Sequence, residues 1–521
     1  MSEVVKINGY DVKDLKSVRS YDTVALMKAD TKLKEGQHVK TKGYYEANDS
    51  GYGEYVIVDD ETLVDDGGLI HVLTNGLRAV LLVNNSVNIK QLGYVDTMTA
   101  SEQTTFLNDV FSKFNNILIK DVNITINDSL ILHTGQNIVI DNSTILNNTS
   151  TNSKYIFDLV DIENVNINGI NSVLKFNKPS TDAQSSIRIR ESKNINITGL
   201  IIEDVGGDGI LLLGTEENLS TNINIENCII DNSRRNGIAL VGGIKGCYIN
   251  RCNIKNTVGT LPQYGIDLEP WETTIYNDDI VISNCYLENN SGGDIDILYN
   301  NRNIKILNNV LNNINTVMTL NNGESSYLKN CTIEGNKINS RIDLNGTQYS
   351  EINILNNNFT NAIIYCGPEI GVTPFYNTYP KNGYLNINNN NFNNSKITCD
   401  TTCNVVIEDN NFYDNTNNCV TVRSSNNIKI NNNNFRNYAQ TDTNKTSVFC
   451  IDISNTHNIS ITNNTFINEQ EVTFTRIITL NANCQNLIAT DNNALNITYS
   501  AFIGKDGTIT HEIIENNLTN S

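Results

Sequence analysis

The chain has 521 residues, of which 39% are hydrophobic and 18% are charged. This length exceeds what one ordinary hydrophobic core holds, so it predicts several domains or an elongated repeat architecture. The formal net charge of -20 argues against binding to nucleic acid or to anionic membranes. No apolar run reaches the roughly eighteen residues of a membrane span, and the start lacks a signal-peptide profile, so we expect synthesis in the cytoplasm without a signal peptide.

The cysteines and histidines restrict the kinds of site that the chain can hold. The eleven cysteines are scattered from Cys228 to Cys484 without a CxxC pair, which favours buried free thiols over a disulfide framework or a zinc site. The histidines leave a gap between His133 and His457. A histidine-based catalytic triad or metal cluster in this central region is therefore excluded.

Residues 1 to about 85 form a predicted N-terminal module rich in β-structure. A short helix is expected near Tyr21 to Ala29, and the segments that follow alternate apolar and polar residues between Gly and Asp turns. Residues 86–119 are expected to lead into the next domain through a capping helix. This helix is predicted over Thr99 to Phe114, because Thr99 and Glu102 form a capping box. Its apolar face carries Phe106, Leu107, Val110, Phe111 and Phe114.

A repeat occupies the rest of the chain. Each instance has two aliphatic residues separated by one other residue, and Cys or Asn three places after the second aliphatic. After a gap of one residue comes an apolar residue that is usually followed by Asn. The second aliphatic serves as a marker, and the steps between markers vary from 20 to 33 residues. The markers are Ile167, Ile197, Ile225, Ile249, Ile282, Ile306, Ile333, Ile354, Ile387, Ile407, Ile430, Ile461 and Ala489.

Alternation with a period of two residues predicts a short strand in each step, and stacked strands of this kind make a solenoid. Further alternating segments follow at residues 209–213, 237–241 and 265–269, which indicates more than one strand per coil. We therefore expect an all-β, right-handed, single-stranded parallel β-helix of roughly thirteen coils over residues 120–500, with a C-terminal cap at 501–521. The Cys or Asn after each marker should stack on its counterpart in the next coil. A leucine-rich-repeat-like solenoid and an Asn-rich disordered tract are the alternatives.

Alignment of the coils on their markers brings acidic residues together at one place. Asp267 and Glu269 should project from the same strand face, because Ile266 and Leu268 point inward. Asp296, which comes with Asp294 from the next coil, should lie in register with Asp267, while the two preceding coils place Leu211 and Ala239 there. The neighbouring coils also supply Asp208, Arg234 and Arg235, and the nearby aromatic residues are Tyr264, Trp271 and Tyr299. An inserted loop at residues 256–265 lies beside this strand, and such loops often carry function.

This combination of residues suits glycoside hydrolysis, which needs one protonated carboxyl group and one ionised carboxylate. A neighbouring carboxylate raises the pKa of one carboxyl group, and an arginine lowers the pKa of another. One group would then be protonated while the other is ionised. The candidate catalytic residues are Asp267, Glu269, Asp208 and Asp296, and the candidate substrate-binding residues are Arg234, Arg235, Tyr264, Trp271, Asp294 and Tyr299. Each acid could instead be merely solvated, and Asp208 could stabilise a turn. No cofactor is expected, although Asp294 and Asp296 could bind Ca²⁺.

The segments VKTKGYYEANDSGYGEYVIVDD and DDGGLIHVLTNGLRAVLL resemble the N-terminal module of bacteriophage tailspike and pre-neck appendage proteins with pectate-lyase-like β-helices. The segments GDGI, RRNGI and GTLPQYGIDLEPW are also similar to parts of β-helix polysaccharide enzymes. The resemblance implies a depolymerase in the virion tail that cleaves a bacterial surface polysaccharide, attaches to tail or baseplate proteins and commonly forms a homotrimer. Two features depart from the family. No recognisable trimerising domain follows the last coils near Asn496, and the segment NIKQLGYVDT only loosely matches the family's usual glycine-rich lead into the capping helix.

Two other activities remain compatible with the sequence. A polysaccharide lyase on the same fold would remove a proton beside a uronate carboxylate, often with Ca²⁺, and would need Arg235 or Tyr264 as its base. A non-enzymatic adhesin would bind glycan in the same groove without cleaving it. The surplus of acids suits a uronate poorly, so hydrolysis is the leading hypothesis.

Overall fold

The computed structural model describes residues 6–7, 10–11, 18–148, 155–177, 185–271, 274–313, 316–322, 328–346, 351–367, 383–437, 449–506 and 509–520. The chain divides into two compact units. The first contains residues 1–149 and 164–173, and the second contains residues 150–163 and 174–521.

The first unit begins with a small β-sheet, which confirms the predicted β-rich character of this region. Five strands pair in the order β3-β4-β5-β7-β6, and alternate residues of the central strand β5, among them Tyr55 and Ile57, are buried. The helix α1 (Val24–Ala29) begins after Thr23, whose hydroxyl accepts a hydrogen bond from the Leu26 N–H. The strands are β3 (Arg19–Tyr21), β4 (His38–Thr41), β5 (Gly53–Val58), β6 (Ile70–Val72) and β7 (Arg78–Leu81), and β1 (Lys6–Ile7) pairs with β2 (Tyr10–Asp11).

The predicted capping helix is present as α2 (Ala100–Lys113), with the capping box between Thr99 and Glu102. Its side chains bond to the backbone of the first coil: Gln103 Oε1 accepts from the Thr125 N–H at 2.7 Å, and Asn108 Oδ1 accepts from the Ile131 N–H at 2.8 Å. The helix therefore covers the first coil, as expected. The remaining elements of this region are β8 (Val87–Asn88), a 3₁₀ helix (Ile89–Leu92), β9 (Asn116–Lys120), β10 (Asn123–Ile126), β11 (Leu130–Ile131), β12 (Asn137–Asp141), β13 (Thr144–Asn147) and β15 (Glu163–Phe176).

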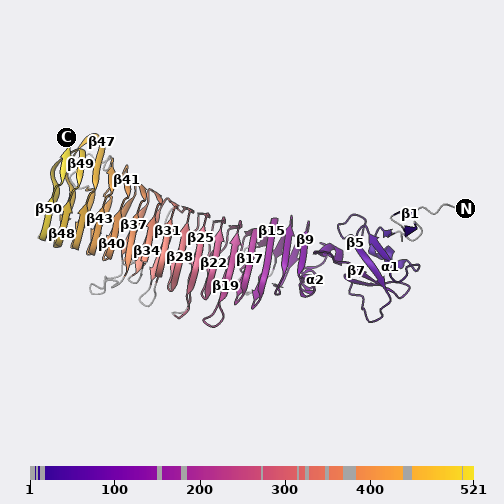
Figure 1. Cartoon of the computed structure of the whole chain (residues 1–521). Helices are drawn as coiled ribbons and strands as arrows, with labels where there is room; N and C mark the ends of the chain where they lie inside the picture. Colours follow the sequence, from indigo (N-terminus) through magenta and orange to yellow (C-terminus); the bar gives the residue numbers. More distant parts are fainter. Residues whose placement is uncertain are drawn as a thin grey trace. The chain divides into compact units, whose positions relative to one another are not determined.

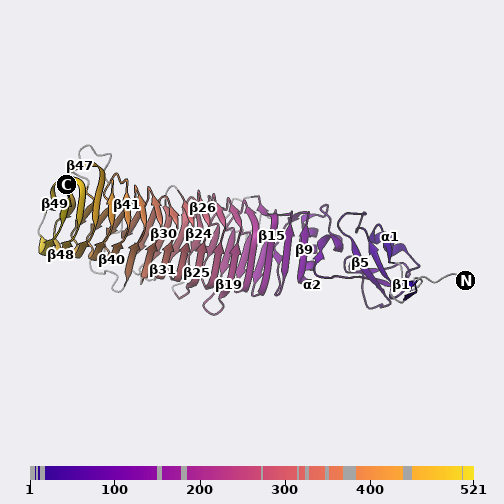
Figure 2. The ribbon, with the colours of Figure 1, turned by 45° about the horizontal axis from the view of Figure 1, so that its top comes forward.

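The repeats form a parallel β-solenoid of about thirteen turns. In the second unit the strands of successive coils stack side by side in three parallel ladders. One ladder contains β25 (Asn277–Ser283) and another contains β24 (Tyr264–Leu268) (Figures 1 and 2). The alternative of a leucine-rich repeat is wrong, because the coils return through further strands and not through helices. The alternative of a disordered Asn-rich tract is also wrong for the described part of the repeat region.

The strands of the three ladders have the following bounds. The first ladder carries the markers and contains β17 (Lys193–Glu203), β19 (Ser220–Glu226), β22 (Ile244–Asn250), β25 (Asn277–Ser283), β28 (Asn301–Leu307), β31 (Leu328–Glu334), β34 (Glu351–Leu355), β37 (Tyr384–Asn388), β40 (Cys403–Glu408), β43 (Asn426–Asn431), β46 (His457–Thr462), β48 (Cys484–Thr490) and β50 (Ile509–Glu515). The second contains β20 (Ile229–Asp231), β23 (Asn253–Lys255), β26 (Tyr286–Glu288), β29 (Val310–Asn312), β32 (Lys337–Ile338), β35 (Asn358–Thr360), β38 (Asn391–Asn393), β41 (Asn411–Tyr413), β44 (Asn434–Arg436), β47 (Thr465–Asn481), β49 (Asn493–Asp506) and β51 (Leu518–Asn520). The third contains β14 (Phe157–Val160), β16 (Ile187–Arg190), β18 (Ile210–Leu213), β21 (Ile238–Leu240), β24 (Tyr264–Leu268), β27 (Gly293–Leu298), β30 (Thr316–Asn322), β33 (Arg341–Gly346), β36 (Ile363–Gly367), β39 (Lys396–Asp400), β42 (Val420–Arg423) and β45 (Ile451–Ser454).

The predicted stacking of the markers is confirmed. Every marker from Ile197 to Ala489 pairs in register with the marker of the next coil. Three places further on, buried asparagines form a ladder: Asn410 Nδ2 donates to Asn433 Oδ1 at 3.0 Å, and Asn390 Nδ2 donates to Asn410 Oδ1 at 3.0 Å. Cysteines take this position in the coils of Cys228, Cys252 and Cys285.

Asparagine has a second role that the sequence analysis missed. Many turns between strands hold an asparagine with a positive φ, such as Asn227 at 53° and Asn308 at 56°. Asparagine tolerates this left-handed conformation better than most residues, because its short side chain can bond locally. The enrichment in asparagine therefore has two causes, the buried ladder and the turns.

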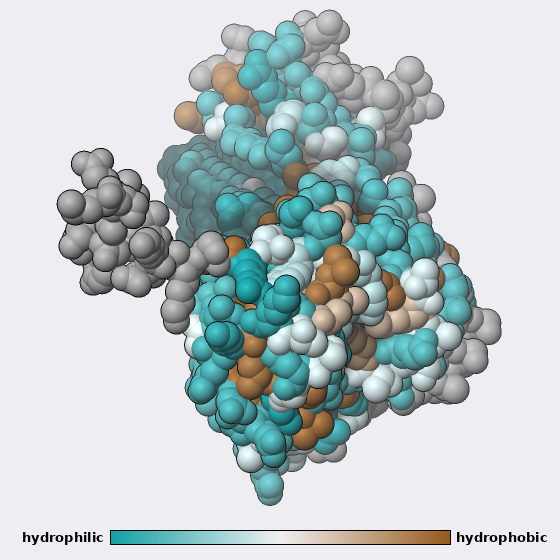
Figure 3. Space-filling view, turned by 90° about the vertical axis from the view of Figure 1, so that its right-hand side faces the viewer, coloured by the Kyte–Doolittle hydropathy of each residue, from teal (hydrophilic) through white to brown (hydrophobic). Residues whose placement is uncertain are grey.

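The surface in the view of Figure 3 is largely hydrophilic, with smaller hydrophobic groups between the polar residues. Within the described residues, no helix has the length and apolar character that a membrane crossing requires.

The cysteines provide a test of the buried core. All eleven are free and buried, so a thiol reagent should label almost none of them in the native protein. After denaturation without reductant, the same reagent should label about eleven thiols per chain, because none is used in a disulfide. Recovery of several disulfides would contradict the stacked assignment.

The ladder of asparagines provides a second test. Asn410→Ala removes the acceptor for the Asn390 N–H groups and the donor to the Ile387 carbonyl. Because these groups are buried, we expect a loss of about 2 to 4 kcal/mol in the free energy of unfolding, measured by denaturant titration. Asn417→Ala, at an exposed turn, is the control and should change stability by less than about 0.5 kcal/mol.

Candidate active site

The acidic cluster lies on the third ladder, on strands β24 and β27. Asp267 pairs in register with Asp296 of the next coil and with Ala239 of the coil before it, which in turn pairs with Leu211. The predicted register of these four positions is therefore confirmed. The inward residues of β24, Ile266 and Leu268, are fully buried.

The carboxyl groups are much less exposed than expected. Asp267 is 1% exposed, and Asp208 and Asp296 are each 3% exposed. The simple alternative, that these acids are solvated on the outside of the solenoid, is therefore wrong. Glu269 differs from the others, because its side chain remains 27% exposed. It is the most accessible carboxylate among the four candidate catalytic acids.

Arg235 and Asn236 connect the acids of neighbouring coils. The Arg235 guanidinium lies 3.4 Å from Asp208 Oδ2 and 3.7 Å from Glu269 Oε2. The Asn236 amide Nδ2 donates to Asp267 Oδ2 at 2.8 Å, and its backbone N–H donates to Asp208 Oδ1 at 3.1 Å. Sequence reasoning missed Asn236, although it directly follows the two arginines.

Burial and mutual repulsion change the proton affinity of this cluster. Burial, with repulsion by Asp296 and Glu269, raises the pKa of Asp267 well above its ordinary value. Burial, with repulsion by Glu269, raises the pKa of Asp296 to about 7. Burial raises the pKa of Asp208 to about 6, although Arg235 opposes the shift. At neutral pH the buried carboxyl groups of the cluster can therefore hold a proton.

Two buried oxygens of the cluster have no hydrogen-bond partner among the described residues. They are Asp267 Oδ1 and Asp296 Oδ1, which come from residues paired across adjacent coils. A buried carboxylate oxygen without a partner is costly, so a shared proton on this pair would lower the free energy of the folded protein.

Asp294 lies apart from the cluster. Its Oδ1 accepts from Asn290 Nδ2 at 3.0 Å. A Cβ atom built on the neighbouring Gly265 would meet Asn290 and Leu287, which shows that this position of the ladder faces the interior. The structure therefore places Asp294, predicted to bind substrate, under the strand with a pKa raised by burial to about 7.

The other predicted binding residues surround the cluster in different ways. The inserted loop crosses Arg234, because the Val258 and Thr260 N–H groups donate to the carbonyls of Ser233 and Arg234. Tyr264 begins β24 and is partly buried. Trp271 is 60% exposed just after β24, and Tyr299 is 41% exposed just after β27. The last two can present aromatic surface to a ligand.

No group of three or more His, Cys, Asp or Glu side chains in the described part of the chain is arranged to hold a metal ion.

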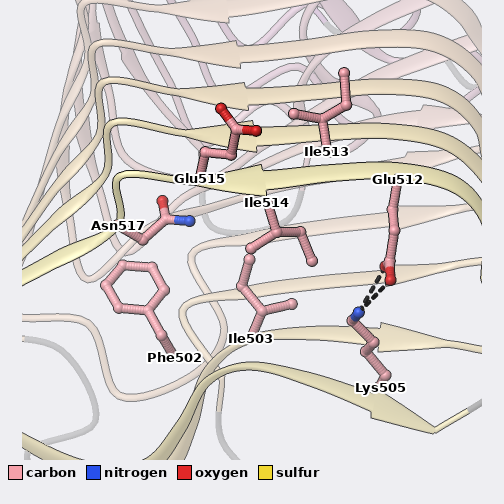
Figure 4. Close-up of a pocket in the computed structure, with 8 residues that line it drawn as sticks. All are labelled: Phe502, Ile503, Lys505, Glu512, Ile513, Ile514, Glu515 and Asn517. Atoms are coloured by element: carbon pink, nitrogen blue, oxygen red, sulfur yellow. Dashed lines mark hydrogen bonds and ion pairs between the residues drawn. The ribbon is translucent and has the colours of Figure 1, made fainter.

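A hollow of about 580 Å³ lies away from this cluster, near the C-terminus, between β49 and β50, where Lys505 pairs with Glu512 (Figure 4). Its lining combines this ion pair with apolar side chains such as Phe502 and Ile514, and it has no paired carboxylates comparable to Asp267 and Asp296.

Residues 20–84 match the family described as phage tail protein small four-stranded beta-sheet domain. The N-terminal module is therefore similar to this phage tail domain family. No curated protein sequence matches the chain significantly.

Solved structures share the solenoid fold at low sequence identity. The tailspike protein gp49 of Acinetobacter baumannii bacteriophage Fri1, a capsular polysaccharide depolymerase, is 16% identical with a TM-score of 0.51, and the match covers 77% of this chain and 72% of that one. A tailspike variant of E. coli bacteriophage HK620 in complex with a pentasaccharide is 12% identical with a TM-score of 0.51, and covers 85% and 82%. The pre-mature gene product 12 of bacteriophage phi29 is 14% identical with a TM-score of 0.54, and covers 81% and 56%. The chain thus combines a segment similar to a phage tail domain family with a β-solenoid whose fold these solved structures share.

The raised pKa of Asp296 predicts how stability depends on pH. The folded protein binds this proton more tightly than the unfolded chain does, so the free energy of unfolding falls as pH rises from about 4 to about 7. Asp296→Asn removes the buried charge. It should raise the free energy of unfolding at pH 8 by up to about 4 kcal/mol and change it little at pH 4.

Denaturant titrations at the two pH values measure this difference. Asp161→Asn, at an exposed turn, is the control and should show no such gain. An Asp296→Asn protein less stable than wild type at pH 8 would contradict a buried charge on Asp296.

Proposed function

We propose that the protein is a phage tail-associated depolymerase that cleaves a bacterial surface glycan by carboxylate-catalysed glycoside hydrolysis. The observation that carries this proposal is the cluster in which accessible Glu269 lies beside Arg235, above the buried pair Asp267 and Asp296. Hydrolysis needs a protonated carboxyl group and an ionised carboxylate together. The first donates a proton to the leaving oxygen, while the second stabilises the sugar cation or activates water.

In this mechanism the raised pKa values of the Asp267–Asp296 pair keep a proton available near neutral pH. This pair supplies the general acid. Glu269, whose Oε2 lies 3.7 Å from the Arg235 guanidinium, acts as nucleophile or as the base that activates water. Asn236 orients Asp267 through its 2.8 Å hydrogen bond, and Trp271 supports a sugar ring on its exposed face.

The environment of Arg235 favours hydrolysis over a lyase reaction. Asp208, Asp267 and Glu269 raise the pKa of Arg235 above its already high ordinary value. A guanidinium in these surroundings keeps its proton and is a poor general base. Elimination would then depend on Tyr264, which leaves the paired carboxyl groups without a role.

The comparisons support the choice of substrate and location. A neighbour of this fold degrades capsular polysaccharide and another binds a pentasaccharide, so we propose a capsule, an exopolysaccharide or a teichoic acid as the substrate. The phage tail domain supports a place in the virion tail, with residues 1–85 as the attachment module that contacts other tail or baseplate proteins. A homotrimer is part of the same proposal.

The variants Glu269→Gln and Asp267→Asn test the assigned roles. Each should lower the rate of glycan cleavage by about two to four orders of magnitude, because the amides cannot exchange the proton. Thermal stability should be kept or, for Asp267→Asn, increased at pH 8, and glycan binding should persist. Asp96→Asn, in the first unit, is the control and should be silent. If both variants keep activity within a few-fold of wild type, the site lies elsewhere.

The products distinguish the three candidate activities. Mass spectrometry on a panel of bacterial surface glycans should show fragments that gain one water for each cut. A lyase would instead produce unsaturated sugars that absorb in the ultraviolet, and we expect neither that absorbance nor inhibition by chelators. An adhesin would leave every glycan intact while binding one of them.

A further inference from the structure

A row of basic residues lies beside the strand that carries the acid cluster. Register pairing aligns Lys193 with Thr221 and then Lys245. The same row continues from Lys245 through Asp278 to Arg302 and Lys329. We call Lys193, Lys245, Arg302 and Lys329 the basic ladder. It spans six consecutive coils, or about 24 Å at the usual spacing of strands.

The basic ladder carries a net positive charge in a strongly negative chain. Lys193, Lys245 and Lys329 are exposed, and none of them forms an ion pair with a carboxylate among the residues that the structure describes. Arg302 pairs with Asp278 at 3.0 Å, and Asp278 is the only acid within the row itself. Because the whole chain carries a charge of -20, this locally positive row differs from the average surface and can attract a polyanion.

A pocket of about 150 Å³ opens on the basic ladder. Lys245, Arg302 and Asp278 line it together with Glu216 and the aromatic side chain of Tyr276. The Arg302 guanidinium lies over the Tyr276 ring, 3.9 Å from its centre, which fixes the planar cation at the rim. The pocket thus offers the Lys245 ammonium and the Arg302 guanidinium as hydrogen-bond donors, the groups that hold an acidic substituent of a sugar.

Hydrogen bonds place the basic ladder directly beside the acid cluster. Asn277, which precedes Asp278, donates from Nδ2 to the Leu240 carbonyl at 3.1 Å. Asn301, which precedes Arg302, donates to the Leu268 carbonyl at 3.3 Å, and Leu268 is followed by Glu269. The strand ends of the two ladders therefore meet at one corner of the coils.

We propose that the basic ladder and its pocket bind an anionic glycan, whose acidic groups lie along the solenoid axis while the neighbouring glycosidic bond reaches Glu269. This inference rests on the proposed function and specifies its substrate class as a polymer with carboxylate or phosphate groups. The separation of the two ladders explains how an acidic active site accepts such a polymer: its charges bind to cations, and only the bond to be cut lies near the carboxylates.

The test measures binding in the Glu269→Gln chain, so that cleavage does not interfere. The probes are polygalacturonate, a glycerol-phosphate teichoic acid and neutral dextran. At least one polyanion should bind, with an affinity that falls as salt increases, and dextran should bind more weakly. The polyanion that binds identifies carboxylate or phosphate as the recognised group.

The ladder variant adds Lys245→Ala and Lys329→Ala to this chain, and the matched control adds Lys32→Ala and Lys34→Ala, which remove the same charge from exposed positions of the N-terminal module. The ladder variant should bind the polyanion about three- to tenfold more weakly and with a smaller salt dependence, whereas the control should stay within about twofold.

Equal binding of the polyanion by the ladder variant and the matched control, or failure of both polyanions to bind, would overturn the inference. If the wild-type chain still cleaves glycan in that case, the hydrolase proposal stands. If the ladder result is as expected but the wild-type chain cleaves no glycan, only the hydrolase proposal fails.

Discussion

Stacking of like residues along the solenoid axis is the constraint on which the rest of the structure depends. Each asparagine of the buried ladder bonds to the next, as Asn410 does to Asn433, and five phenylalanine rings from Phe359 to Phe466 stack with centres 4.6 to 5.0 Å apart. Because each coil contacts mainly its neighbours, a residue type that satisfies one coil can satisfy the next. The coils can then differ in length, and loops can be inserted without loss of register.

The same constraint concentrates charge. A carboxylate at one ladder position lies directly beside the residue at that position in the next coil, which is how Asp267 and Asp296 become neighbours although they are far apart in sequence. Their burial then raises their pKa values, which is the property on which the proposed acid catalysis depends. A few coils of the same solenoid place cations in register at the adjacent corner. In the proposed function, a charged polymer would bind on this ladder and be cut on the other.

The sequence predicted the solenoid, the markers, the capping box at Thr99 and the pairing of Asp267 with Asp296, because aliphatic alternation and residue counting determine which positions face inward and which share a register. The sequence did not predict the low exposure of the carboxyl groups. Counting residues along one strand cannot show that side chains from other coils, such as Asn236, cover an outward carboxylate. The placement of Asp294 was missed for a similar reason, since the strand turns inward at Gly265. The catalytic roles stay predictions.

In the proposed function, the glycan is cut at the accessible carboxylate beside Arg235. A structure of the Glu269→Gln chain with an oligosaccharide, prepared from a glycan that the wild-type protein degrades, would test this directly. We predict a glycosidic oxygen within hydrogen-bond distance of residue 269 and a sugar ring against Trp271. An oligosaccharide bound on another face of the solenoid, with the cluster of Asp267 and Asp296 away from any glycosidic bond, would contradict it.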